Sequence, residues 1–577
     1  MKEIKAERSH LAGIAVLILY ISGLVFVTSF HELWFDETQA WLIARCASYK
    51  EMLTEVPHYE GHPPFWHLLL SIFAKNGAPV EFTLKAINIT FSAVAMALLI
   101  FRSPFPKTVR YLLPFTYFFF YHYGVYSRPY SVTMIAVFLA AMTYKRRNEH
   151  PWRYILSLAL LSLTTAYGIM ISGGLCIVWT TEILSELKKE KKLLKFRKDK
   201  RFYSLCFILA VAVMLIITIF PADDCYYGGA ELELSFIDLF KIKSSYVTMA
   251  VIPFESWSGV LMGVNGLKDM PAMILPEVLC GIGLWTAFSA IAAKNGKFLT
   301  FFIPYFLVSG FMSFKYVSAH HLGIGALFHV FIFWIIMEQN GEIKLPDIFK
   351  KLDIKAASPL FRKIVYVTAG AIWFMPVVYS VVASVNDIHY QSSITAFADT
   401  IIENHLEDKK IFVRWKFDYE GNDDEEGINK YLFNVLEMPS PHDTVKENKT
   451  YLMSDAAILQ PYFSRNIFMN FNVDCPDDLY MHYKYKENSE AVFEKWREKG
   501  LPDFIIGYCP IDEVYDEEML GGVRYLPIQI IEYSFIYKTD SDTAYERLYM
   551  REDLFDDYPQ FRWIDDQTGN VFKEKSQ

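Results

Sequence analysis

The sequence lacks several features that would assign it to a common soluble class. Only 7 of its 577 residues are cysteine and none form a C-x-x-C pair, which excludes a disulfide-dense secreted scaffold and a cysteine-rich structural zinc site. Its 28 glycines exclude a collagen-like chain, and an apolar content of 53% excludes a disordered one. Neither a P-loop nor a Rossmann fingerprint is present, so ATP and nucleotide-sugar cofactors are not indicated.

Charged residues are also scarce. They make up 21% of the chain, and the mean hydropathy is +0.18, which over this length indicates an integral membrane protein. The net charge of −9 is unevenly divided: residues 1–385 hold 36 Lys and Arg against 26 Asp and Glu, whereas residues 386–577 hold 20 against 39. A basic, apolar part therefore precedes an acidic, water-soluble part. Without a basic block interleaved with aromatic residues, we expect no nucleic-acid partner.

Long apolar runs predict about eleven membrane helices. They lie at 11–30, 84–101, 111–127, 129–144, 202–220, 271–293, 298–314, 316–337 and 364–386, with two more inside 154–181. That last run has basic residues at both flanks, so we predict two short helices that turn near Gly168 or at Gly173-Gly174. The first run lacks a following small-residue cleavage site, which favours an uncleaved helix over a signal peptide.

Basic loops fix the predicted orientation, because they stay in the cytoplasm. The segment 188–201 alone carries nine basic residues, and the N-terminus is basic too. We therefore predict a multi-pass cell-membrane protein with a cytoplasmic N-terminus. Residues 1–386 form the transmembrane domain, with a first external loop at 31–83, and residues 387–577 form an extracytoplasmic α/β or α+β domain. Strands are predicted at 411–415, 503–508, 527–537 and 544–550, and a helix at 491–500.

The most informative stretch follows the first helix. Asp36 and Glu37 lie there among aromatic residues, at an apolar boundary where a poorly solvated carboxylate gains a raised pKa and can act as a base. The alternative is an exposed loop acid near the lipid headgroups. The sequence His62-Pro63-Pro64 then opens a short apolar run that Lys75 ends. Proline suits the first turn of a helix, and the shortness of the run predicts a helix lying in the membrane interface.

An acidic pair after the first membrane helix, followed by His-Pro-Pro before an interfacial helix, resembles the GT-C superfamily of membrane glycosyltransferases. It is most similar to the protein O-mannosyltransferase and aminoarabinose transferase group. The resemblance implies a lipid-phosphate-linked sugar donor and a reaction on the outer face of the membrane. It also implies that Asp36 is the catalytic carboxylate and Glu37 its partner, and that His62, Pro63 and Pro64 match the motif that shapes the site.

A polyprenyl-phosphate leaving group gains negative charge as the glycosidic bond breaks, so cations at the outer leaflet should bind it. The candidates at the outer ends of the predicted helices are Arg45, Lys85, Arg128 beside Tyr130, and Lys315 with His320 and His321. Snorkelling at the interface is the alternative for the Lys and Arg side chains, and packing for the histidines. Relatives often carry Arg or Tyr-Arg where this chain has the histidine pair. We expect no cofactor, and a divalent metal held by Asp36 or Glu37 with a histidine is the lesser alternative.

The sequence thus predicts a glycosyltransferase in which Asp36 acts as general base on an acceptor hydroxyl, while Glu37 binds sugar or acceptor. The donor is a polyprenyl-phosphate sugar, the acceptor a glycan, a protein or a lipid, and membrane lipids surround the body. A transporter or flippase is the alternative, as is a surface-glycan assembly protein with an external binding domain. A transporter should carry ionisable residues near helix centres or repeated broken helices, and the sequence has neither.

Overall fold

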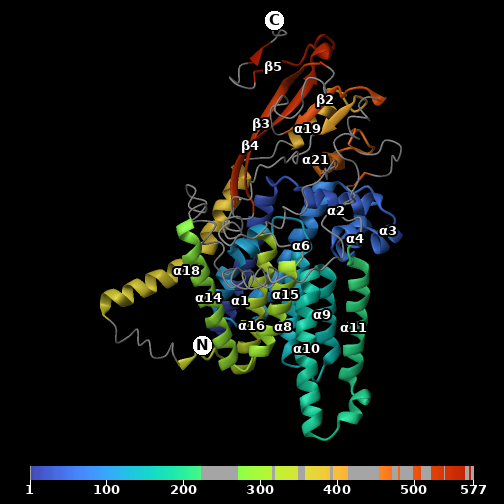
Figure 1. The fold of residues 1–577 in the computed structure, drawn as a ribbon. Helices are drawn as coiled ribbons and strands as arrows, with labels where there is room; N and C mark the ends of the chain where they lie inside the picture. The colour runs from blue at the N-terminus through green and yellow to red at the C-terminus, as the bar shows by residue number, and fades with distance from the viewer. Residues whose placement is uncertain are drawn as a thin grey trace.

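The computed structural model describes residues 2–222, 271–314, 319–347, 358–389, 394–413, 454–470, 479–480, 498–507, 522–537, 540–565 and 571–572. A bundle of helices occupies one end of the molecule and a small sheet the other, with short helices of the first loop between them (Figure 1). The bundle contains α1 (Lys2–Thr28), α6 (Val80–Arg102), α8 (Tyr130–Tyr144), α9 (Pro151–Thr164), α10 (Ala166–Lys189), α11 (Lys200–Ile219), α14 (Pro271–Lys294), α15 (Phe298–Phe314), α16 (Ala319–Asn340) and α18 (Pro359–His389).

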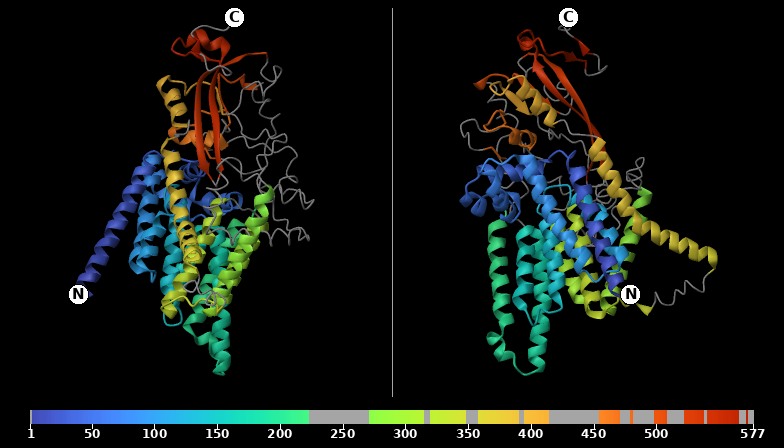
Figure 2. Two further views of the ribbon diagram at one scale, coloured as in Figure 1. Left: turned by 90° about the vertical axis from the view of Figure 1, so that its left-hand side faces the viewer. Right: turned by 180° about the vertical axis from the view of Figure 1, so that it is seen from behind.

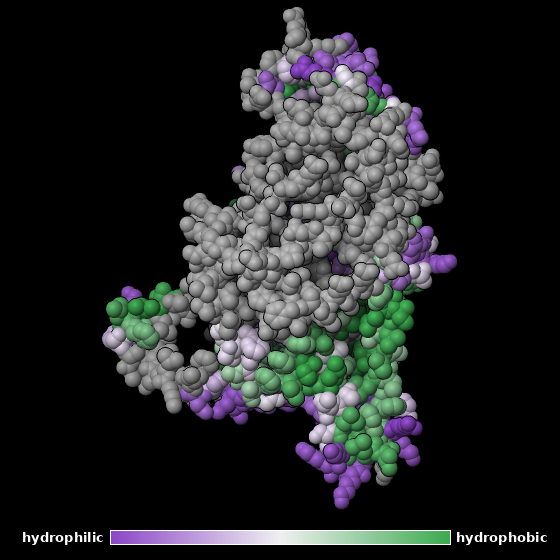
Figure 3. Space-filling view, in the orientation of Figure 1, coloured by the Kyte–Doolittle hydropathy of each residue, from purple (hydrophilic) through white to green (hydrophobic). Residues whose placement is uncertain are grey.

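Five helices in the described ranges are long and apolar enough to cross a membrane. They are His10–Thr28, Val80–Arg102, Ala166–Lys189, Lys200–Ile219 and Gly323–Asn340, and shorter apolar helices cover Phe65–Ala74, Tyr130–Tyr144 and Phe298–Phe311. Apolar side chains cover the visible flank of the bundle, and hydrophilic ones gather at its free end (Figure 3). The fold therefore fits a helical membrane protein with several spans, and the number eleven stays a prediction.

One predicted helix is broken, which corrects the expectation for 111–127. The structure has α7 (Lys107–Leu112), a 3₁₀ turn at Leu113–Phe115 and a π-helical turn at Phe118–His122. Pro114 explains the break, because its ring removes an amide donor and clashes with the preceding turn. The aromatic side chains of the π turn are buried in the bundle core. The chain then turns at 123–129 before α8 begins.

The run 154–181 does form parts of two helices, but the break comes earlier than expected. α9 ends at Thr164 and α10 begins at Ala166. The hydroxyl of Thr165 accepts a hydrogen bond from the amide of Gly168 at 2.9 Å, which caps α10. Gly174 lies inside α10 against the backbone of Pro304 in α15, where a Cβ atom would come within 2.6 Å. Glycine there serves close helix packing, not a turn.

The first loop folds into four short helices: α2 (Phe35–Cys46), α3 (Tyr49–Thr54), α4 (Val56–Glu60) and α5 (Phe65–Ala74). α5 begins directly after the two prolines, within the residues predicted for the interfacial helix. It packs along α2 through a small core that includes Trp41, Trp66 and Leu70. The loop is thus a compact layer on the bundle, and Figure 1 shows it between the bundle and the sheet.

The C-terminal sheet consists of β1 (Ile411–Val413), β2 (Phe504–Gly507), β3 (Tyr525–Tyr537) and β4 (Asp540–Arg551) in the order β1-β2-β4-β3. β1 and β2 are parallel, and the other two pairings are antiparallel. All four strands overlap the predicted ones, and α19 (Ile394–Glu403) and α21 (Ser454–Leu459) accompany them. Of the predicted helix 491–500, residues 491–497 lie outside the described ranges.

The sheet region and the first loop share one hydrophobic core. Leu42, Ile43 and Met52 of the loop pack in the same buried cluster as Phe397 and Ile401 of α19. α18 continues past residue 386 to His389, and Figure 2 shows it bending and rising from the flank of the bundle to the sheet. Pro376, inside α18, supplies a cause for the bend. The predicted boundary at 386/387 therefore falls inside a helix.

Candidate functional site

The first turn of α2 places the acidic pair. Trp34 precedes the helix in an extended conformation, and its amide donates to Oε2 of Glu37 at 2.8 Å. This contact caps the helix, and the positive N-terminal end of α2 favours both carboxylates. Consecutive helical residues point about 100° apart, so the two acids face different surroundings.

Asp36 faces Arg128. Oδ2 of Asp36 lies 2.5 Å from Nη1 of Arg128, and the two side chains are 29% and 13% exposed. The structure therefore joins two of the predicted site residues across 92 positions of sequence. The pair is partly open to solvent, so one edge of it is accessible to a ligand. We call it the ion pair below.

The turn that carries Arg128 is held from α6. The fully buried Asn88 donates from Nδ2 to the carbonyl oxygens of Gly124 at 2.7 Å and Tyr126 at 2.9 Å. Asn88 was not among the predicted site residues, because an asparagine in an apolar helix has no distinctive spacing. Its contacts fix the backbone immediately before the guanidinium, and so fix where that cation lies.

Glu37 is buried, with no exposed side-chain surface. Its Oε1 accepts from the amide of Ser127 at 2.5 Å, and its Oε2 lies 3.1 Å from Nε2 of His31. The other ring nitrogen of His31 lies 3.0 Å from Oδ2 of Asp387, near the end of α18. We call His31, Glu37, Ser127 and Asp387 the sealed network. It ties the start of α2, the turn before α8 and the end of α18 together.

His31 is the cation of the sealed network. Burial opposes its protonation, but the charges of Asp387 and Glu37 outweigh burial and raise the pKa of His31 to about 10. The imidazolium therefore stays charged at neutral pH and donates to both carboxylates. Sequence reasoning missed Asp387, which is 356 residues from His31 and carries no local signal.

Gln39 lies three residues after Asp36, on the same side of α2. Its Nε2 donates to Oε1 of Glu60 at 2.9 Å, at the end of α4. Burial raises the pKa of Glu60 to about 7, and the hydrogen bond from Gln39 lowers it only in part. Neither residue was predicted as a site residue, although Glu60 directly precedes the Gly61-His62-Pro63-Pro64 stretch.

His62, Pro63 and Pro64 form the turn into α5, after Gly61 in the left-handed region at φ 65°. Both prolines are buried, and His62 is half-buried. Burial lowers the pKa of His62 to about 4. Burial, with the neighbouring charge of His62, lowers the pKa of His67 to about 3. Both imidazoles are therefore neutral at physiological pH.

The remaining first-half candidates lie in different settings. Arg45 lies nine residues beyond Asp36 along α2, roughly 13 Å by helical rise, and donates to the carbonyl of Pro461 at 3.4 Å. Lys85 pairs with Glu81 at 3.3 Å, one turn before Asn88 on α6. Tyr130, at the start of α8, is buried and stacks on Tyr123 with ring centres 4.5 Å apart.

The turn before α16 holds the last three predicted site residues, and only one of them has a described side chain. Lys315 lies outside the described residues, as does the side chain of His320. His321 is buried in the first turn of α16, with its ring centre 4.7 Å from that of Tyr167. That helix start lies close to the segment before α8, because a Cβ atom on Gly323 would meet the hydroxyl of Tyr123. The contact of His321 with Tyr167 is aromatic packing.

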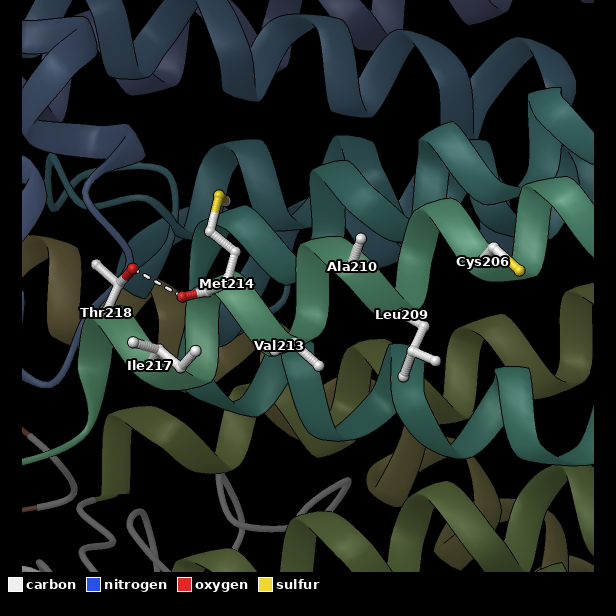
Figure 4. Close-up of a pocket in the computed structure, with 7 residues that line it drawn as sticks. All are labelled: Cys206, Leu209, Ala210, Val213, Met214, Ile217 and Thr218. Atoms are coloured by element: carbon white, nitrogen blue, oxygen red, sulfur yellow. Dashed lines mark hydrogen bonds between the residues drawn. The ribbon is translucent and has the colours of Figure 1, made fainter.

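The described residues contain no group of three His, Cys, Asp or Glu side chains placed to hold a metal ion. An open apolar groove runs along α11 (Figure 4), and its lining is Cys206, Leu209, Ala210, Val213, Met214, Ile217 and Thr218. Its composition suits lipid chains, and it brings no charged group that could take part in chemistry.

Comparison of the chain with family models, with curated proteins and with solved structures found no match in any of the three. A partly exposed carboxylate and guanidinium lie side by side at the junction of loop and bundle. One group can accept a proton and the other can stabilise a developing anion.

Proposed function

We propose that this chain is an integral membrane glycosyltransferase that transfers a sugar from a polyprenyl-phosphate donor to an acceptor on the outer face of the membrane. The observation that carries the proposal is the ion pair of Asp36 and Arg128, on the first loop after α1 and at the start of α8. Eleven spans, a cytoplasmic N-terminus and an extracytoplasmic C-terminal domain belong to the same proposal.

The proposed reaction is a direct displacement at the anomeric carbon. The acceptor hydroxyl gives its proton to Asp36 and forms the new C–O bond, while the bond from the anomeric carbon to the phosphate oxygen breaks. The leaving phosphate keeps the electron pair. A guanidinium carries five N–H donors, so Arg128 can hold Asp36 through Nη1 and direct others to phosphate.

Glu37 is assigned a positioning role in this proposal. Its carboxylate is buried and accepts from Trp34 and Ser127 while contacting His31, so it holds the turn next to Arg128 rather than the sugar. Lys85 lies one turn from Asn88, near the same turn, and is the remaining nearby cation candidate. Membrane lipids and a glycan, protein or lipid acceptor are the proposed partners.

The transporter alternative has weak support in the described part of the bundle: His329 is buried near the middle of α16, and its Nδ1 lies 2.7 Å from the carbonyl oxygen of Gly325 in the same helix. The charged pairs there lie at helix ends, for example Arg147 with Glu182 and Arg201 with Glu186. A transporter would be expected to hold ionisable side chains near the middle of the membrane.

The test is an assay of the purified full-length protein with a panel of polyprenyl-phosphate sugars, and identification of the labelled product. We expect transfer from at least one donor, and Arg128→Gln should lower the rate on the order of 100-fold. Lys107→Gln, at the start of α7 and beyond the end of α6 that lies away from the loop, is the matched control and should leave the rate unchanged. Absence of transfer and of donor hydrolysis across the panel would reject the proposal.

A further inference from the structure

We propose that Glu60, Gln39, His62 and His67 form a second subsite without a cationic side chain beside the ion pair, which binds the hydroxyl groups of a neutral sugar ring. This inference rests on the proposed function and refines it. The ion pair would hold the phosphate end of the donor, and the subsite would hold its carbohydrate end.

The helical spacing brings the subsite to the ion pair. Asp36 and Gln39 are three residues apart on α2, so their Cβ atoms lie about 5–6 Å from each other on one side of the helix. Gln39 is buried and donates to Glu60 at 2.9 Å. The carboxyl group of Glu60 therefore accepts from Gln39, which lies on the same side of α2 as Asp36. Glu60 is only partly buried.

Three buried polar atoms in the stretch that follows Glu60 have no hydrogen-bond partner among the described residues. They are Nδ1 of His62, Nε1 of Trp66 and Nδ1 of His67. Trp66 and His67 are more than nine-tenths buried, and the two histidines are close enough for the charge of one to affect the other. A buried hydrogen-bonding group without a partner costs about 1–3 kcal/mol. Three such groups in one short stretch therefore indicate a hydrogen-bonding partner from outside the described residues.

The chemistry of the lining selects the ligand class. His62 and His67 are neutral, since burial lowers both pKa values far below physiological pH, so they offer phosphate no positive charge. A neutral imidazole carries one donor and one acceptor, the Gln39 amide carries both, and a carboxyl group accepts from neighbouring hydroxyls. Alternating donors and acceptors without net positive charge match vicinal hydroxyl groups. Positive charge lies on the other side, at Arg128.

The experiment separates the two ends of the donor. The full-length protein is titrated with a polyprenyl phosphate that carries no sugar, and with its glycosyl esters from the transfer panel. Glu60→Gln should weaken binding of the active glycosyl ester at least tenfold and leave binding of the bare phosphate within twofold. Arg128→Gln should weaken both ligands. Retained binding of the bare phosphate shows that the Glu60 variant is folded.

Gln39→Met provides a second variant, which removes the contact to Glu60 and keeps the carboxyl group. It should weaken the glycosyl ester about threefold to tenfold, again without affecting the bare phosphate. Equal effects of Glu60→Gln on both ligands, or no effect on either, would overturn the subsite while leaving the proposed enzyme intact. If the wild type bound neither ligand and transferred nothing, the proposed function would fail and the subsite with it.

Discussion

The two sides of α2 place the neighbouring residues Asp36 and Glu37 in very different surroundings. On one side, the sealed network encloses Glu37 with a cation and two backbone amides, and leaves it no exposed surface. On the other side, Asp36 and Glu60 each have one described partner and remain partly exposed. Two adjacent acids in the sequence are therefore not one functional unit. Helical geometry sends one carboxylate into a structural role and leaves its neighbour available for chemistry.

Removing the buried carboxylate is the strongest test of the difference between the two sides of α2. Glu37→Ala leaves the His31 cation and two amides without their acceptor, and a broken buried ion pair costs about 3–5 kcal/mol. Asp36→Ala should cost less than this, because the Asp36 side chain is 29% exposed and that of Glu37 is fully buried. Unfolding of both purified variants in the same detergent measures the difference. Equal losses of stability would show that the two sides do not differ.

The pH dependence of stability isolates the cation of the sealed network. The pKa of His31 is raised in the folded protein to about 10 from 6.5, so the folded state retains a proton that the unfolded chain releases. Its stabilisation is complete below pH 6.5 and is lost as the pH rises toward 10. We expect the wild-type unfolding temperature to fall across that range more steeply than that of His31→Gln. Parallel curves for the two proteins would contradict a charged His31.

A smaller effect should follow from loosening the turn that carries Arg128. Asn88→Ala removes the donor to the carbonyls of Gly124 and Tyr126, which costs about 1–3 kcal/mol. Transfer should fall as well, because the guanidinium is no longer held. Ser92→Ala on the same buried face of α6 serves as the control, since its hydroxyl lies a longer 3.5 Å from the carbonyl of Tyr123. If the two variants behaved alike, the turn would not depend on Asn88.

The smallest expected change concerns Lys85. Its pair with Glu81 spans one turn of α6, and such partly exposed pairs contribute about 0.5 kcal/mol or less. Lys85→Gln should therefore leave stability almost unchanged. A fall in its affinity for bare polyprenyl phosphate would show that Lys85 binds the phosphate together with the ion pair. Unchanged stability together with unchanged phosphate affinity would make Lys85 an interface anchor only.

Local patterns in the sequence predicted the parts of the site that depend on local physics. The apolar boundary after the first helix singled out Asp36 as a candidate base, and the outer ends of the predicted helices gave Arg128 as a candidate cation for the phosphate. The sequence pattern does not show which of the two acids meets the arginine. That depends on the residue at which α2 begins, because the start of the helix sets the direction of each side chain. The same applies to Glu37, whose carboxylate meets the distant amide of Ser127 as well as the nearby Trp34 and His31.

Long-range packing explains the remaining gaps. The contact of His31 with Asp387 and the core shared by α2 and α19 join segments more than 350 residues apart, and no spacing in the sequence encodes them. Arg45 is directed to the sheet region for the same reason. The break at Pro114, by contrast, has a local signal in the sequence, since proline inside a helix removes a hydrogen bond and favours a kink or a break.

The most direct test of Asp36 as the proton acceptor is the single-turnover transfer rate of Asp36→Asn with saturating donor. We predict a fall of about 100-fold to 10,000-fold in rate, with donor binding retained, because the amide cannot accept the proton. Glu55→Gln, an exposed acid of the same loop, should keep the wild-type rate. A rate for Asp36→Asn equal to that of the wild type would contradict the role of Asp36.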